Sequence, residues 1–111
     1  MMEPRVKARL WVQMALRLGD IEGCHGAVLR KGDPDAGGVL VVLRQQERML
    51  VLSQIRSAEG ELSWLRGTGH APVDQATVDA YLERRVSSDP DLWILEFETM
   101  DLKPPFDARI L

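Results

Sequence analysis

Two side chains that can act as nucleophile, base or metal ligand are adjacent at Cys24 and His25, and one further histidine follows at His70. A thiol needs a base within hydrogen-bond reach to serve as a nucleophile, and the neighbouring His25 is poorly placed for that role. A catalytic pair would therefore require His70 to fold onto Cys24. Structural zinc sites use four ligands, typically in closely spaced pairs, and no such spacing is present. We expect Cys24 to be a small, half-buried residue at a helix end, and we expect no metal.

Carboxylates recur in two Asp-Pro-Asp tripeptides, at residues 33–35 and 89–91. If the two met in space, their oxygens could bind a divalent cation or perform general acid–base chemistry. Each tripeptide offers only two carboxylates, however, whereas a calcium loop supplies several oxygens within about a dozen residues. Aspartate also shapes turns, and proline ends helices. We expect Asp33 and Asp35 to make a turn, and Asp89 and Asp91 to follow a helix.

Arg30 and Lys31 precede a glycine-bearing loop at residues 32–38. An anion could be held there by the two cations and by free loop amides. Asp33 and Asp35 in the same loop would repel a phosphate. The loop also lacks the Gly-Lys-Ser/Thr of a P-loop. A solvated hairpin is the better interpretation, and Arg30 and Lys31 stay as candidate interface residues. No cofactor motif is present, so we expect no cofactor.

Three tryptophans stand out in a chain with only 5% aromatic residues. Trp64 and Trp93 fall in predicted strands, so we expect them to fill the core. Trp11 lies on the same side of an early alternation as several basic residues. Because tryptophan is enriched where proteins contact partners, Trp11 is the preferred interface candidate.

Composition narrows the class of protein. A chain of 111 residues fits one domain. It has no apolar run near the roughly 20 residues that span a bilayer, and we expect no secretory signal. A single cysteine requires no oxidising compartment, so we expect a cytoplasmic protein. Net charge is +3 over residues 1–31, −1 over 32–72 and −5 over 73–111. The basic residues Arg5, Lys7, Arg9 and Arg17 could touch phosphates, but a pI near 5.3 makes nucleic acid an unfavoured partner.

Hydrophobic periodicity predicts the order helix, four strands, helix, strand. The unbroken apolar run Val39–Leu43 is typical of a strand covered on both faces, so we expect it at the centre of the sheet. Gly23 suits the end of the first helix and Asp74 the start of the second. The predicted elements are an extended entry at 5–9, a helix at 10–22, strands at 25–31, 39–43, 49–55 and 62–65, a helix from 74 to 88 and a strand at 92–97. The three strands from residue 39 to residue 65 should form an antiparallel meander.

Several segments together resemble one family. They are Leu10-Trp11-Val12-Gln13, then Arg30-Lys31-Gly32-Asp33-Pro34-Asp35-Ala36-Gly37, then Ala80-Tyr81, and finally Asp89-Pro90-Asp91-Leu92-Trp93. In this order and spacing they are similar to the bacterial family catalogued as domain of unknown function 1491. The resemblance covers residues 5–99. It implies a small stand-alone protein of alphaproteobacterial type, and it carries no activity, cofactor or catalytic residue.

The expected fold is a single α+β domain over residues 1–111. It is a two-layer sandwich of an antiparallel or mixed sheet of four to five strands, with two helices packed on one face. The core covers about residues 5–99, and the tail at 100–111 has too little apolar content to predict order.

Three functions remain open. The first is a non-enzymatic binding or accessory module that acts through an unknown protein partner or as a homo-oligomer. The second is a small enzyme with a loop site drawn from Cys24, His25, Asp33, Asp35 and His70. The third is a weak nucleic-acid contact through the basic first third.

Overall fold

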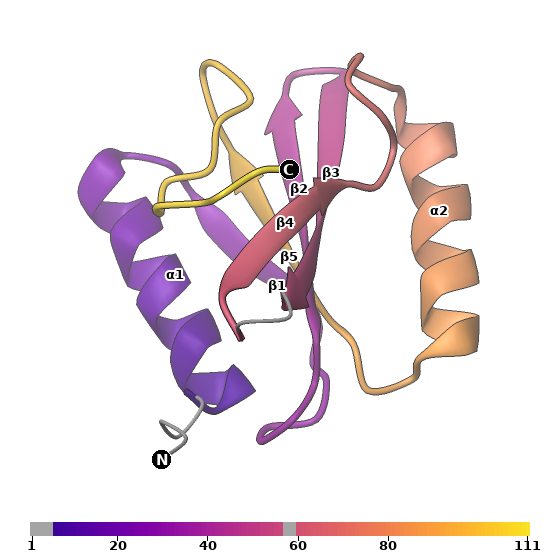
Figure 1. Ribbon diagram of the computed structural model, residues 1–111. Coiled ribbons are helices and arrows are strands. Elements are labelled where there is room, and N and C mark those ends of the chain that lie inside the picture. The colour runs from indigo at the N-terminus through magenta and orange to yellow at the C-terminus, as the bar shows by residue number, and fades with distance from the viewer. Residues whose placement is uncertain (1–5, 57–59) are drawn as a thin grey trace.

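The computed structural model describes residues 6–56 and 60–111. Two helices and five strands follow one another in the predicted order (Figure 1). Among these described residues, neither helix is both long enough and apolar enough to cross a membrane. The elements are α1 (Ala8–Glu22), β1 (Gly26–Arg30), β2 (Val39–Gln45), β3 (Arg48–Arg56), β4 (Leu62–Arg66), α2 (Gln75–Ser88) and β5 (Trp93–Glu98).

The strands form one mixed sheet in the order β1-β5-β2-β3-β4. β2, β3 and β4 pair antiparallel, which confirms the predicted meander. β5 pairs antiparallel with β1 and parallel with β2, so the last strand of the chain lies between the first two. β2 is the middle strand, and every residue from Val39 to Leu43 is buried. The prediction drawn from this apolar run is therefore confirmed.

The two helices lie on opposite faces of the sheet (Figure 1), which corrects the expectation that both pack on one face. Successive side chains of a strand point to opposite faces. In β2, Val41 and Leu43 pack with the α1 core, whereas Leu40 and Val42 pack with the α2 core. A sheet whose middle strand is apolar on both faces needs a helix on each. The α+β class and the mixed sheet are confirmed, in three layers rather than two.

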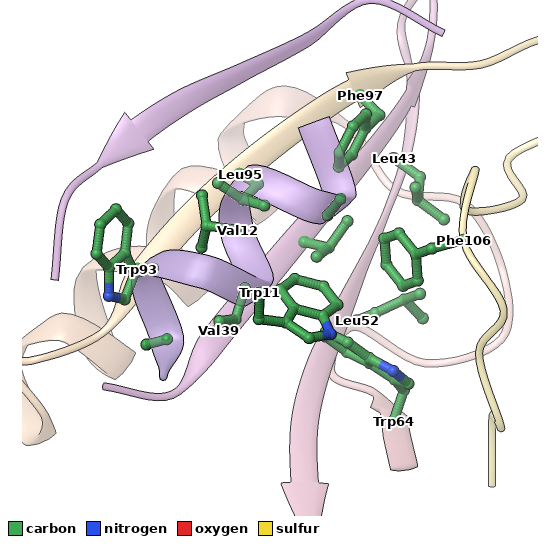
Figure 2. Packing of buried hydrophobic residues seen from close by; sticks show 13 residues of the cluster. Trp11, Val12, Val39, Leu43, Leu52, Trp64, Trp93, Leu95, Phe97 and Phe106 are labelled. Atoms are coloured by element: carbon green, nitrogen blue, oxygen red, sulfur yellow. The ribbon is translucent and has the colours of Figure 1, made fainter. Parts of the chain in front are cut away.

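The core on the α1 face is built around aromatic rings (Figure 2). The ring centroids of Trp11 and Trp64 lie 5.4 Å apart, and Phe106 lies 5.1 Å from Trp11 and 5.5 Å from Trp64. Phe97 of β5 meets Phe106 edge-on at 6.2 Å. Offset and edge-on contacts of this kind add to the stability that area burial provides. Trp64 and Trp93 are core residues, as predicted.

α1 begins earlier than the alternation predicts, because residues 8 and 9 are helical rather than extended. Residue 5 lies outside the described part of the chain. Lys7 at the N-cap provides no side-chain hydrogen bond. Instead the first amides donate to a neighbouring loop: Ala8 N to Asp35 O at 3.2 Å and Arg9 N to Pro34 O at 3.0 Å. This tertiary cap stabilises a helical turn that the local sequence does not favour. At the other end Gly23 takes the left-handed conformation, as predicted.

α2 has the predicted ends. The Asp74 carboxylate accepts hydrogen bonds from the amide of Thr77 at 2.9 Å and from its hydroxyl at 2.7 Å. These bonds hold the pKa of the Asp74 carboxyl below its ordinary value, the hydroxyl contributing most, because they favour the charged form. The helix ends at Ser88, and Asp89 is extended because it precedes Pro90.

The C-terminal segment, residues 100–111, packs against the sheet. Phe106 is only 7% exposed, inside the aromatic core. Trp64 of β4 donates its amide to Arg109 O at 2.8 Å, and Leu111 donates to Trp64 O at 2.9 Å. Ile110 forms a parallel bridge with Trp64. The segment thus covers the β4 edge of the sheet, an order that the sequence pattern did not predict.

Candidate functional site

The side chains proposed as an enzyme site are distributed over the fold. Cys24 and His25 precede β1, whereas Asp33 and Asp35 follow it. The full length of this extended strand therefore separates the two pairs, far beyond hydrogen-bond distance. His70 lies in the loop between β4 and α2, with β5, β2 and β3 between it and β1. Over residues 6–56 and 60–111, no group of three or more His, Cys, Asp or Glu side chains could hold a metal ion.

Cys24 is a half-exposed free thiol. Partial burial raises the pKa of this thiol, and the negative charges of Asp101 and Glu22 raise it further. A nucleophilic cysteine needs the opposite environment, one that stabilises the thiolate. Its surroundings therefore oppose the role of nucleophile.

The two Asp-Pro-Asp tripeptides do meet, but through their backbones. Asp33 donates its amide to Asp91 O at 3.0 Å. The indole of Trp93 donates to Asp33 O at 2.7 Å, and the Arg30 guanidinium donates to Pro90 O at 2.7 Å. We call this contact the Asp-Pro-Asp junction. It joins the β1–β2 loop to the loop that precedes β5.

Two carboxylates of the Asp-Pro-Asp junction, those of Asp33 and Asp89, accept hydrogen bonds within their own turns, and that of Asp35 lies 3.7 Å from the ammonium of Lys7. Asp33 Oδ2 accepts from the amides of Asp35 at 3.1 Å and Ala36 at 2.7 Å. Asp89 Oδ1 accepts from the amide of Asp91 at 3.1 Å. These are the local bonds by which aspartate fixes turns. They also engage two of the loop amides that an anion beside Arg30 and Lys31 would use. The junction positions α1, β1 and β5 and offers no open site.

Trp11, the preferred interface candidate, is only 8% exposed and lies in the aromatic core. Its ring is therefore not available to a partner. The alternation that placed it beside basic residues does not apply, because residues 8–22 are helical and Trp11 falls on the buried side of α1. Lys31 is exposed, and Arg30 is half-buried in the junction.

A shallow depression of about 430 Å³ lies along α2, between this helix and the loop that follows β4. Apart from the Arg84 guanidinium, which lies 6.0 Å from the centroid of the Tyr81 ring, its polar side chains are already engaged. Asp74 and Thr77 bond to each other, Thr68 Oγ1 accepts from the amide of Val51, and Tyr81 Oη accepts from Arg85. The depression is lined by Gly67, Thr68, Asp74, Ala76, Thr77, Ala80, Tyr81 and Arg84. Such a surface provides no converging set of free groups for chemistry.

A polar network ties α2 to the sheet. Arg44 of β2 pairs with Glu96 of β5, with 3.1 Å between Nε and Oε1. The Arg44 guanidinium also donates to the side-chain oxygen of Gln75. The side-chain nitrogen of Gln75 in turn donates to Asp79 Oδ1 at 2.8 Å. Arg85 of α2 donates to the buried Ser53 of β3 at 2.8 Å. These contacts fix the position of α2.

The two edges of the sheet differ. The β4 edge is covered by the C-terminal segment through the bonds of Trp64. At the other edge, β1 pairs with β5 on its inner side, and no strand in the described ranges pairs with its outer side. Val28 and Leu29 are 42% and 51% exposed there. We call this outer side of β1 the open edge.

The model of a protein family of unknown function, DUF1491, matches residues 6–107. The chain belongs to the DUF1491 family. The resemblance seen in the sequence is therefore confirmed, over slightly more of the chain.

Two solved structures of a DUF1491 family protein from Caulobacter crescentus CB15 have similar folds. The crystal structure matches with a TM-score of 0.84 and 28% identity, over 96% of this chain and 100% of that one. The NMR structure matches with a TM-score of 0.83 and 28% identity, over 96% of each chain. Protein Atu0922 from A. tumefaciens shares the fold at 24% identity, with a TM-score of 0.79 over 96% and 97% of the two chains. Among curated proteins there is no match.

In this DUF1491 chain, reasoning from sequence missed the open edge. The apolar run Ala27–Leu29 indicates a strand, but it does not show which strands are neighbours. An edge position is decided by the insertion of β5 between β1 and β2. One signal was present in the sequence, because Val28 and Leu29 are consecutive apolar residues. In a regular strand consecutive side chains point to opposite faces, so the two cannot both face the same core.

Proposed function

We propose that this DUF1491 protein is a non-enzymatic binding module that accepts an extended segment of a protein partner along the open edge of β1. The observation that carries the proposal is the difference between the two sheet edges. The chain covers β4 with its own C-terminal segment, whereas no strand of the described ranges covers β1. An unpaired edge can add a further strand, because its amides and carbonyls are free to pair with another chain.

The backbone of β1 has the geometry for such pairing. His25 O accepts from Glu98 N at 2.9 Å, so the backbone amide and carbonyl of His25 point toward β5. Residues of an antiparallel pair alternate between bonded and non-bonded positions. Gly26 and Val28 therefore direct their amides and carbonyls outward, along the open edge. The register shifts after Val28, which limits regular pairing to the first half of the strand.

The side chains at the open edge support a partner with apolar residues. Val28 and Leu29 are exposed apolar side chains on consecutive residues, so a strand added here meets apolar surface beside the paired backbone. The bonded length is short, because β1 has five residues and an irregular second half. A short added strand buries little area, so binding at this edge should be reversible. The free Cys24 thiol supports a reducing, cytoplasmic location for this encounter.

Site-specific photo-crosslinking tests this function in living cells. A photoreactive residue in place of Leu29 should give a discrete adduct with a partner protein. The same residue in place of Leu65, an exposed leucine of β4, serves as the control and should give none. A Leu29 adduct no stronger than the Leu65 adduct would refute the proposal.

A backbone variant separates strand addition from general stickiness. Val28→Pro removes an amide that points outward, and proline is tolerated at such edge positions. This variant should keep the wild-type circular dichroism spectrum and lose the Leu29 adduct. Ala27→Pro is the matched control, because the amide of Ala27 faces β5 and its loss should destabilise the protein. Retention of the adduct in folded Val28→Pro would exclude strand addition.

A further inference from the structure

The outer side of α1 carries an apolar stripe that residues 6–56 and 60–111 leave exposed. Leu10, Met14 and Ile21 are 47%, 44% and 68% exposed. Together with Arg17 they follow one another at intervals of four, three and four residues. This is the spacing of the seam along which two helices pack as a left-handed pair. We call these four residues the α1 stripe. The side of α1 that faces the sheet is a different set: Ala8, Trp11, Val12, Ala15 and Gly19.

The charges of α1 are in the reverse of the order that a helix favours. Lys7 and Arg9 lie at its beginning, and Asp20 and Glu22 lie at its end. The first turn holds no acidic residue and the last turn holds no basic one. Because a helix is positive at its N-terminus and negative at its C-terminus, each pair of charges is repelled by the nearby end of the helix. Lys7 is partly compensated within one molecule by Asp35, 3.7 Å away, but both of these side chains are well exposed, so their ion pair adds little stability.

We propose that the α1 stripe is a self-association surface, on which α1 of a second copy packs antiparallel. An antiparallel pair places Met14 near the centre of both helices, where the two stripes face each other. Lys7 and Arg9 then lie beside the partner's Asp20 and the partner's Glu22, and the reverse pairs form at the other end. The charges that are unfavourable in one helix become complementary between two.

The charge pattern favours a second copy over the other apolar surfaces that could cover α1. A lipid surface rich in anionic headgroups would attract Lys7, Arg9 and Arg17 but repel Asp20 and Glu22 at the other end of the same helix. A helix of identical sequence in the antiparallel direction complements both ends. A two-fold axis perpendicular to the helices makes two identical helices antiparallel, so a symmetric dimer has this arrangement.

The α1 stripe also predicts how strong the association is. α1 has 15 residues. A single pair of helices of this length buries less than the roughly 1,600 Å² of a standard interface, so the dimer should depend on concentration. Arg17 lies within the stripe and must extend its guanidinium to the rim, with its aliphatic part along the apolar residues. Arg17→Leu should therefore strengthen the dimer.

Sedimentation velocity of the full chain, from about 1 µM to about 1 mM, measures this association. We expect the mass to rise with concentration from 12.5 kDa toward twice that value. Met14→Lys should weaken the dimer at least tenfold, which is about 1.4 kcal/mol. Leu65→Lys is the matched control, because Leu65 has the same 44% exposure on β4, and it should leave the dimer unchanged.

A charge exchange tests the antiparallel direction. Asp20→Arg alone should weaken the dimer, because it faces the partner's Arg9. The double variant Arg9→Asp with Asp20→Arg should restore it. A parallel pair would not show this recovery, so its absence would overturn the proposed direction.

Two results would overturn the self-association surface itself. One is a monomer at every concentration, including for Arg17→Leu. The other is cosedimentation of the monomer with phosphatidylglycerol vesicles that Met14→Lys abolishes, which would assign the stripe to a lipid surface. A dimer that responds to Val28→Pro and not to Met14→Lys would also contradict it, and would place the contact at the open edge instead. The two proposals use different faces, so each can fail alone.

Discussion

Phe106 is the side chain through which the C-terminal segment enters the core, and Phe106→Ala should cost the protein about 4 kcal/mol of unfolding free energy. Phe106 is 7% exposed and its ring lies between 5.1 and 6.2 Å from those of Trp11, Trp64 and Phe97. Truncation of a buried phenylalanine to alanine typically costs about 3–5 kcal/mol, from lost burial and the cavity left behind. Three aromatic contacts keep this site away from the lower end of that range, and we take its middle. For a chain of this size the thermal midpoint should fall by about 16 °C.

Urea unfolding measures this loss. Tryptophan fluorescence follows the site directly, because Trp11 and Trp64 contact the Phe106 ring, and far-UV circular dichroism follows the whole fold. The two probes should give one transition, shifted to lower urea with an unchanged slope. Met100→Ala is the control within the same segment, because Met100 is 90% exposed. Such a surface change should alter stability by less than about 0.5 kcal/mol.

The reasoning would be refuted by a small effect. If Phe106→Ala cost less than about 1 kcal/mol with an unchanged slope, the ring would not be packed as described. The C-terminal segment would then not be part of the core, and the β4 edge would be as open as the β1 edge. The contrast between the two edges, on which the proposed function depends, would be lost.

Three smaller changes test other parts of the fold. At Gly32 a Cβ would overlap the carbonyl oxygen of Asp91. Gly32→Ala should therefore destabilise the protein by about 2 kcal/mol in the same urea titration. Gly38→Ala should have a much smaller effect, because the nearest atom is a side-chain carbon at 3.3 Å. Asp74→Ala should lower the thermal midpoint by a few degrees at pH 7. The folded pKa of this carboxyl is depressed below the ordinary value of 3.8. Its contribution is therefore present above that value and disappears as the pH falls through the lower folded pKa. A midpoint difference that does not shrink as the pH is lowered below 3.8 would contradict the assignment. Alkylation of Cys24 by iodoacetamide should show a pH midpoint above that of an unstructured cysteine peptide, since burial and nearby carboxylates raise the thiol pKa. A midpoint below that of the peptide would be inconsistent with the structure, because the thiolate is the reacting form.

Local features of the fold could be predicted from the sequence because they depend on residues close together in the chain. Gly23 and Asp74 mark helix ends through their own backbone preference and hydrogen bonding. The run Val39–Leu43 identifies the middle strand through its lack of alternation. That same run implies cover on both faces of the sheet, so it contained the signal that the two helices lie on opposite sides. The start of α1 could not be predicted, because its cap comes from a distant loop.

The candidate site was harder to predict because its features depend on strand order. The residues around Trp11 are compatible with a strand or with a helix, and its ring faces the core only because the segment is helical. Phe106 and Ile110 are isolated apolar residues with no periodicity, so nothing local indicates that they pack against Trp64. The open edge exists because β5 lies between β1 and β2, and a pairing of strands so distant in sequence leaves no local pattern.

The interior position of β5 has a consequence for synthesis of the chain. The meander β2–β3–β4 and α2 consist of near neighbours in sequence, and such contacts can form early. β1 can be joined to them only through β5, which is translated more than sixty residues after β1 ends. Until residues 93–98 emerge, β2 therefore presents an unpaired edge with apolar side chains on both of its faces. A product truncated before β5 should be prone to aggregation and proteolysis, whereas one truncated after β5 would keep β2 paired on both sides and lose the cover of β4 together with Phe106 of the aromatic core.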